Sequence, residues 1–125
     1  MVHIYVDDGE LVIELDKLEK LFSLKSKLRI PLSCIEKIVH IKDVDEGERE
    51  RLLPRMKLGG MRLGSIVYGT FSTGVGRGFF ATRSLERSVV IYTRGCVPYR
   101  VIVVEAPDPA TMEAIENALS KRLGV

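Results

Sequence analysis

The sequence has little of what metal-binding, membrane-spanning or nucleic-acid-binding proteins usually require. Only two of its 125 residues are histidine and two are cysteine, too few and too scattered for a zinc site. No apolar run approaches the roughly 20 residues that cross a bilayer. The formal net charge is only +2, whereas nucleic-acid-binding proteins usually carry a strong basic excess. Nucleic acid and anionic membranes are therefore not the favoured partners, and no metal or other cofactor is expected.

The two cysteines, Cys34 and Cys96, stand far apart and match no CxxC motif. The pattern favours two reduced, buried thiols, because an unpaired cysteine usually behaves as a small apolar residue. A disulfide between them is the alternative that the sequence leaves open. The first eight residues contain no basic region followed by an apolar run, so they do not resemble a signal peptide. The sequence thus predicts a soluble, cytoplasmic protein.

What is present is typical of one globular domain spanning 1–125. Hydrophobic residues make up 46% of the chain and charged residues 29%, a balance that argues against disorder. A domain of this length buries roughly two thirds of its unfolded surface, which is enough for a hydrophobic core. We therefore expect a single folded unit.

Four short strands are predicted in the first third of the chain. The runs 3–6 and 10–15 flank Asp7-Asp8-Gly9, and an Asp-Gly pair between β-rich runs predicts a tight hairpin. Alternation of apolar and polar residues predicts a third strand over 27–33. The apolar run 35–41 is irregular in period, which indicates a fourth strand with a bulge near its start.

Two helices are predicted, one short and one long. Asp16 and Glu19 have the spacing of a capping box, which predicts a two-turn helix over 17–24. For the long helix, Asp108 is a suitable N-cap, and 108–123 carries an apolar stripe typical of one buried helix face. The residues of that stripe are Met112, Ile115, Leu119 and Leu123.

A strongly charged segment, 43–57, interrupts the predicted strands. Nine of its fifteen residues are charged, which predicts a connection on the surface. A helical turn is expected around 48–53, ended by Pro54. Gly59-Gly60 and Gly64 follow and predict that the chain turns sharply before the next strands.

The stretch 64–104 reads as four short strands in a row, with glycine turns between them. Each strand is rich in valine, isoleucine and aromatic residues, which favour extended backbone. Together with the single long helix at the end, this order of elements predicts an α+β fold that is mainly β.

Three phrases of the sequence, and the order of its elements, carry a resemblance to a known family. The phrases are Ile30-Pro-Leu-Ser-Cys-Ile-Glu-Lys-Ile38, Tyr68-Gly-Thr-Phe-Ser-Thr73 and Gly78-Phe-Phe-Ala81. In these features the chain resembles a bacterial pleckstrin-homology-like (PH-like) domain. The resemblance implies a bent barrel of about seven antiparallel strands, with a short helix after strand two and a C-terminal capping helix. It also implies a binding or scaffolding role, since members are mostly binding modules and several bacterial ones assemble into rings.

Two loops that could bind phosphate are interpreted otherwise. In phosphoinositide-binding relatives the loop between the first two strands is basic, whereas the matching loop here, Asp7-Asp8-Gly9, is acidic and short. The glycines of Gly74-Val-Gly76-Arg-Gly78 precede a predicted strand, while a nucleotide-binding loop must open a helix. We therefore interpret the second loop as a hairpin turn.

Five basic residues form the candidate anion-binding set. Arg77 and Arg83 lie in the stretch of four strands, and Lys25, Lys27 and Arg29 lie before and along the third strand. Arg77 and Arg83 fall at opposite ends of one predicted strand, so the pattern favours solvated strand ends over a converging site. Lysine along an edge strand also protects against edge-to-edge aggregation, which is a structural role.

No constellation of residues predicts catalysis. A nucleophile needs a base, and the base needs an orienting group. Neither the neighbouring pair Ser33 and Cys34 nor His40 has such partners at a spacing that indicates a catalytic site. The segment 43–47 lacks the third oxygen ligand and the distal glutamate of a calcium loop, so no metal site is expected there.

The sequence therefore predicts a non-enzymatic, PH-like binding or assembly module that acts through protein–protein contacts. Its protein partner is not identified, and a homo-oligomer is expected. The exposed strand edges and the segment 43–57 are the surfaces that such a module would use. The alternative is a module that binds an anionic ligand, a lipid headgroup or nucleic acid, through the five basic residues.

Overall fold

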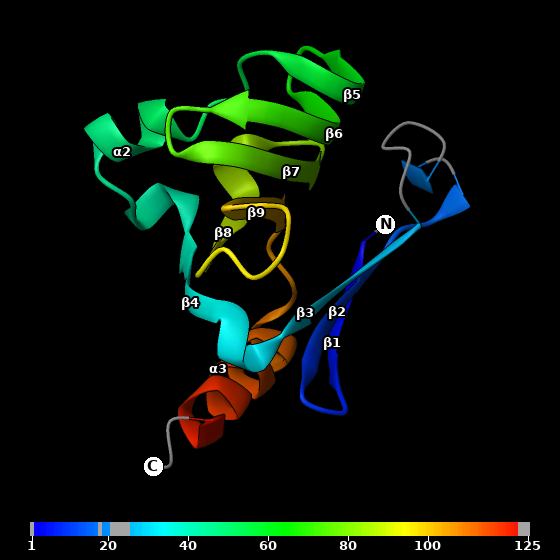
Figure 1. Cartoon of the computed structure of the whole chain (residues 1–125), viewed down its shortest axis with the longest axis vertical. Coiled ribbons are helices and arrows are strands. Elements are labelled where there is room, and N and C mark those ends of the chain that lie inside the picture. The colour runs from blue at the N-terminus through cyan, green and yellow to red at the C-terminus, as the bar shows by residue number, and fades with distance from the viewer. Residues whose placement is uncertain (1, 18, 21–25, 123–125) are drawn as a thin grey trace.

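The computed structural model describes residues 2–17, 19–20 and 26–122 and shows two β-sheets with a C-terminal helix (Figure 1). The predicted class, α+β and mainly β, is confirmed. One sheet has the order β1-β2-β3 and the other the order β4-β8-β9-β7-β6-β5, and together they do not form a closed barrel. The strands are β1 (His3–Asp7), β2 (Glu10–Glu14), β3 (Lys27–Pro31), β4 (Ile35–His40), β5 (Lys57–Leu63), β6 (Ile66–Thr73), β7 (Gly76–Thr82), β8 (Ser88–Thr93) and β9 (Val101–Glu105). The helical segments are η1 (Leu32–Cys34), η2 (Ile41–Asp43), α2 (Glu46–Arg51), η3 (Leu85–Arg87) and α3 (Pro109–Arg122).

The first hairpin is the one that the Asp-Gly pair predicts. β1 and β2 pair antiparallel, with Asp7 opposite Glu10. Asp8 and Gly9 connect them with φ angles of 50° and 75°, the left-handed conformation that a two-residue hairpin turn requires. β3 joins the other side of β2, so β1 and β3 are the two edges of this sheet.

Asp16 and Glu19 form the predicted capping box. The backbone N–H of Glu19 donates to Asp16 Oδ1 over 2.9 Å, and the backbone N–H of Asp16 donates to Glu19 Oε1 over 3.0 Å. Glu19 is buried and also accepts a hydrogen bond from the Tyr68 hydroxyl of β6 (3.3 Å), which connects this turn to the larger sheet. Residues 17, 19 and 20 are helical, and the rest of the predicted helix 17–24 lies outside the described residues.

β9 occupies the middle of the six-stranded sheet. It pairs antiparallel with β8 but parallel with β7, where Phe79 lies opposite Ile102. The prediction of a barrel made only of antiparallel strands is therefore wrong. β4 joins β8 with a register shift between Ile35 and Lys37, close to the bulge that the sequence predicts.

β5 contains the glycine pair that the sequence pattern interprets as a sharp turn. Gly59 and Gly60 lie inside the strand, and Gly60 is directly opposite Gly69 of β6. A Cβ atom on Gly60 would lie 2.6 Å from the Cα atom of Gly69, so only glycine allows the two backbones to approach this closely. The predicted turn at this pair is therefore wrong, because the glycines serve strand contact. In the part of the chain that the structure describes, β5 pairs with no strand other than β6 and is an edge of the sheet.

The charged segment 43–57 forms the surface connection that its composition predicts. Its helical turn is α2, which begins after Asp45, and Asp45 Oδ1 accepts a hydrogen bond from the backbone N–H of Glu48 (2.8 Å). Leu52 anchors the segment to the six-stranded sheet, since it is 1% exposed and packs beside Phe71. The segment thus lies on the face of that sheet that is turned away from α3.

α3 covers the core between the two sheets, as its apolar stripe predicts. Met112 is 7% exposed and Ile115 2% exposed, and the partly buried Leu119 packs against the same cluster. Leu123, the last residue of the predicted stripe, lies outside the described residues. Burial of each large side chain of this kind contributes roughly 1.5–3 kcal/mol, so α3 is an integral part of the fold.

Cys34 and Cys96 form a disulfide, so the prediction of two reduced thiols is wrong. Their Cα atoms lie 6.0 Å apart, within the range of ordinary disulfides. Cys34 ends η1 and is fully buried, while Cys96 lies in the loop between β8 and β9. The backbone N–H of Arg94 in that loop also donates to the Cys34 carbonyl (2.8 Å). Pairing of β4 with β8 brings the two cysteines together, and no local sequence pattern predicts this contact.

Candidate functional site

Lys27 and Arg29, two members of the predicted anion-binding set, are engaged by carboxylates of their own sheet. Lys27 Nζ lies 3.3 Å from Glu14 Oε1, and the Arg29 guanidinium lies 3.1 Å from Glu10 and 3.5 Å from Asp7. The hydrogen bond to Glu10 raises the pKa of Arg29. Because both cations already have acidic neighbours, β3 does not present an open anion site.

Arg77 and Arg83 lie at opposite ends of β7, as the sequence pattern indicates. Arg77 is the second residue of the strand, and Arg83 follows its last residue. Arg83 Nε lies 3.9 Å from Glu105 Oε1, and contact with the Tyr68 hydroxyl raises the pKa of Arg83. Lys25, the fifth member of the set, lies outside the described residues. The described members are therefore divided between two sheets and do not converge.

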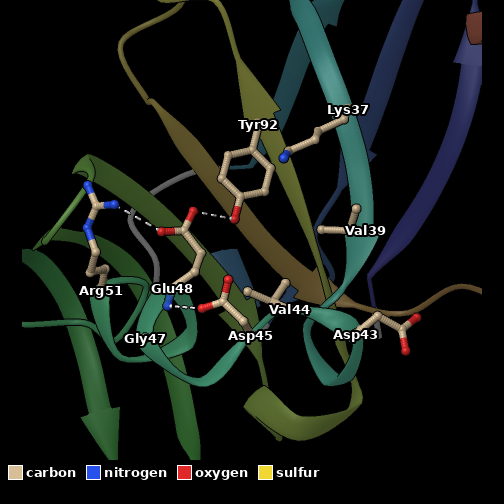
Figure 2. A pocket seen from close by; sticks show the side chains of 9 residues that line it. All are labelled: Lys37, Val39, Asp43, Val44, Asp45, Gly47, Glu48, Arg51 and Tyr92. Atoms are coloured by element: carbon tan, nitrogen blue, oxygen red, sulfur yellow. Dashed lines mark hydrogen bonds and ion pairs between the residues drawn. The ribbon is translucent and has the colours of Figure 1, made fainter.

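A polar hollow of about 570 Å³ lies between α2 and the strands β4, an edge of the sheet, and β8, its neighbour (Figure 2). Its walls come from three parts of the chain: strand β4, the segment around α2, and strand β8. Charged and polar groups outnumber apolar ones among its lining residues, which are Lys37, Val39, Asp43, Val44, Asp45, Gly47, Glu48, Arg51 and Tyr92.

Glu48 is the centre of the hydrogen bonding in this hollow. The Tyr92 hydroxyl donates to Glu48 Oε2 over 3.0 Å, and Arg51 Nη1 lies 3.2 Å from Glu48 Oε1 (Figure 2). Lys37 Nζ lies 4.8 Å from the centre of the Tyr92 ring, a cation–π distance. Burial and the hydrogen bond to Glu48 raise the pKa of Tyr92 well above its ordinary value.

Glu48, Tyr92, Arg51 and Lys37 hold one another in place. Glu48 accepts from two donors, and Tyr92 stays protonated at neutral pH because its pKa is raised. Within the part of the chain that the structure describes, no three His, Cys, Asp or Glu side chains are grouped so that they could hold a metal ion. The contacts in the hollow therefore fix α2 against β8.

We expect Tyr92→Phe to lower the free energy of unfolding by about 1 kcal/mol at pH 8, because Glu48 loses a hydrogen bond. The raised pKa of Tyr92 adds a pH dependence. Its stabilising effect is complete below the ordinary tyrosine pKa of 10.0 and declines as the pH rises above that value, since the unfolded chain then ionises first. Urea denaturation at pH 8 and at pH 10.5 measures both effects. A phenylalanine variant that loses as much stability between these pH values as the wild type would contradict this account.

Five of the six exposed large apolar side chains among the described residues lie on or beside two sheet edges. The first group, on β1, is called the β1 patch and consists of Tyr5 and Val6, which are 36% and 37% exposed. The second, on and just before β5, is called the β5 patch and consists of Met56, Leu58 and Leu63, which are 66%, 48% and 69% exposed. Leu53 (40% exposed) lies apart from both, in a hollow with Ile41 and Leu85. The two patches are the strongest candidate for a functional surface, because apolar groups gathered on an edge mark sites of contact.

Sequence reasoning named strand edges and the segment 43–57 as surfaces, but it missed the residues that matter there. The sequence did not point to the β5 patch because strand β5 was not predicted. The Tyr92–Glu48 contact could not be predicted because the two residues lie 44 positions apart and neither stands in a motif. Only the charge density of 43–57 gave a signal that this segment faces solvent.

None of the helices in the described ranges is long and apolar enough to cross a membrane. Comparisons of the chain with protein-family models, with curated proteins and with solved structures find no match.

Proposed function

We propose that the chain is a non-enzymatic binding and assembly module that works through protein–protein contacts and associates with copies of itself. The observation that carries the proposal is the β5 patch on an unpaired sheet edge. An edge strand presents a row of free N–H and C=O groups to which another strand can add. Proteins usually protect such an edge with charges or by keeping the strand short. β5 carries the exposed Lys57 and Arg62, yet it runs for seven residues and also exposes Leu58 and Leu63.

Kinship with PH-like domains is part of this proposal. Two sheets, a C-terminal helix packed on the core and a charged connection between strands support it. The parallel pairing of β7 with β9 and the open arrangement of the sheets do not belong to the antiparallel barrel of that family. The proposed function rests on the exposed edge and does not depend on the kinship.

The alternative function, binding of a lipid headgroup or nucleic acid, has less support. Lys27, Arg29 and Arg83 each have a carboxylate within ion-pair distance, which weakens their attraction for an external anion. Arg77 forms no ion pair within the described ranges, but one exposed arginine does not make a site. Binding of a lipid headgroup or nucleic acid is therefore the weaker of the two candidate functions.

The cytoplasmic location stays a prediction, and the disulfide argues against it. Cytosolic reducing systems keep most thiols reduced, so stable disulfides are typical of oxidising compartments. The bond between the buried Cys34 and Cys96 favours such a compartment as the place where the module works.

Light scattering over a concentration series tests the proposed function. We expect the average mass of the wild type to rise with concentration. Leu58→Glu places a charge on the β5 edge and should shift the midpoint of association to at least tenfold higher concentration, which corresponds to about 1.4 kcal/mol. Leu53→Glu makes the same change at a similarly exposed leucine away from the edge and should shift it less than about twofold. A wild-type chain that stays monomeric at every concentration up to about 1 mM, an affinity limit of about 4 kcal/mol, would refute self-association.

A further inference from the structure

The charges beside the two apolar patches have opposite signs. Next to the β5 patch stand Lys57 and Arg62, both exposed, and the strand contains no acidic residue. The β1 patch continues into Asp7 and Asp8, both exposed, and the strand contains no lysine or arginine. One free edge of the chain is thus apolar and basic, and the other is apolar and acidic.

A groove beside the β1 edge extends its acidic character. This groove, of about 500 Å³, runs between β1 and the segment that leads from β9 into α3. Asp108 and Glu105 line it, together with His3 and Tyr5 of β1. Glu105 already lies 3.9 Å from Arg83, so the acidic character of the groove comes mainly from Asp108. Asp7 keeps one exposed ion pair, with Arg29 at 3.5 Å, while Asp108 has no ion pair among the residues that the structure describes. The surroundings of β1 therefore favour a basic strand as neighbour.

Both edges are available to another molecule. Among residues 2–17, 19–20 and 26–122, β1 pairs only with β2 and β5 only with β6, so each has one side without a strand from this part of the chain. The two edges belong to different sheets and lie in different parts of the molecule, β5 at one end of its long axis and β1 in the other half (Figure 1). Among the described residues, no strand pairs with the outer side of β1 or of β5. A second copy of the chain offers a basic edge to β1 and an acidic edge to β5.

Pairing of two β5 edges with each other is disfavoured. An antiparallel pair of this kind would collect two copies of Lys57 and two of Arg62 along a seam of seven residues. Like charges facing each other across strands destabilise the pair. Pairing of β5 with the β1 edge of another copy instead brings Lys57 and Arg62 toward acidic groups and covers Leu58 with Tyr5 and Val6.

We propose that copies of the chain associate head to tail, with the β5 edge of one copy adding to the β1 edge of the next. The inference rests on the proposed function and specifies the partner, which is a second copy, and the surface that it offers. A contact between two different surfaces does not close after two copies, so it generates rings or open chains. The seam joins short strands, and the association is correspondingly weak and sensitive to salt.

Complementation of two blocked variants tests the arrangement. Val6→Lys places a cation on the β1 edge, where it repels the basic β5 edge, and Leu58→Glu places a carboxylate on the β5 edge, where it repels Asp7. Both positions are exposed, and thermal unfolding of each variant verifies that it is folded. Each variant alone should be monomeric at a concentration where the wild type associates. A 1:1 mixture should recover association, because the intact β5 edge of Val6→Lys can add to the intact β1 edge of Leu58→Glu, and the two introduced charges are opposite in sign and do not repel at the other contact.

The other outcomes distinguish this inference from the proposed function. If Val6→Lys associates like the wild type while Leu58→Glu does not, two β5 edges pair with each other, and the head-to-tail arrangement is overturned while the assembly function stands. If both variants associate like the wild type, another surface is used and the inference fails. A monomeric wild type removes both the inference and the proposed self-association.

Discussion

Replacing Gly60 or Gly69 by alanine should lower the free energy of unfolding by about 3 kcal/mol or more. The two glycines face each other across β5 and β6, with φ angles of +135° and +123°. A Cβ atom on either would lie 2.6 Å from the Cα atom of the other and closer still to a backbone carbonyl oxygen. Since the obstructing atoms are backbone, relief requires the strands to separate, and separation breaks the ladder that holds β5.

Gly64→Ala is the matched control for these variants. Gly64 also has a positive φ (+60°), but nothing lies within 4 Å of the position that its Cβ atom would occupy. We therefore expect only the conformational penalty of about 1–2 kcal/mol for that variant. Urea denaturation of the three variants separates the steric effect from the conformational one. Equal losses at positions 60, 69 and 64 would show that the strands tolerate a side chain between them.

Reduction of the disulfide between Cys34 and Cys96 should lower the free energy of unfolding by about 4 kcal/mol. The bond closes a loop with a sequence separation of 62, and a constraint over such a length removes much of the conformational entropy of the unfolded chain. For a domain of this size the melting temperature should fall by roughly 10 °C or more. Thermal unfolding with and without a thiol reductant measures the change.

The double variant Cys34→Ala, Cys96→Ala is the control for reduction. Its melting temperature should lie near that of the reduced wild type and should not respond to reductant. Because Cys34 is fully buried, alanine is a better replacement there than serine, whose hydroxyl would lack a solvent partner. If titration shows both thiols free after reduction and the melting temperature of the wild type is unchanged, the stabilising role of the bond is refuted.

The elements that the sequence predicts correctly are those that local chemistry determines. A two-residue hairpin turn requires left-handed backbone, which Asp8 and Gly9 readily adopt, so the pair specifies its hairpin. Asp16 and Glu19 satisfy each other's backbone N–H groups, whatever the rest of the chain does. The apolar stripe of α3 likewise depends only on helical spacing. Each of these signals spans fewer than about 15 residues, which is the range over which periodicity and capping act.

The features that the sequence did not reveal depend on contacts between distant segments. Glycine has low strand propensity, so the local pattern at Gly59-Gly60 indicates a turn unless the partner Gly69 is known. The parallel direction of β7 and β9 follows from the path of the intervening chain, which no local spacing encodes. The bond of Cys34 with Cys96 likewise requires the pairing of β4 with β8.

The candidate site illustrates the same limit. Charge alone selected Lys27, Arg29 and Arg83, and the fold then placed a carboxylate beside each of them. Exposure of apolar side chains is a property of the folded surface, so neither Leu58 nor Leu63 stood out from the many buried leucines of the sequence. The surface proposed for assembly became visible only when the edge position of β5 was known.

The position of β9 has a consequence for biosynthesis. Among the described strands it is the last in chain order, yet it joins the two halves of the larger sheet, β4 with β8 on one side and β5, β6 and β7 on the other. Until residues 101–105 emerge, a nascent chain therefore holds two partial sheets, and the inner edge strand of each lacks the hydrogen-bond partner that β9 supplies. Such unpaired edge strands can pair with those of other nascent chains. Recruitment of chaperones should accordingly be greatest late in translation and should end abruptly once β9 has inserted.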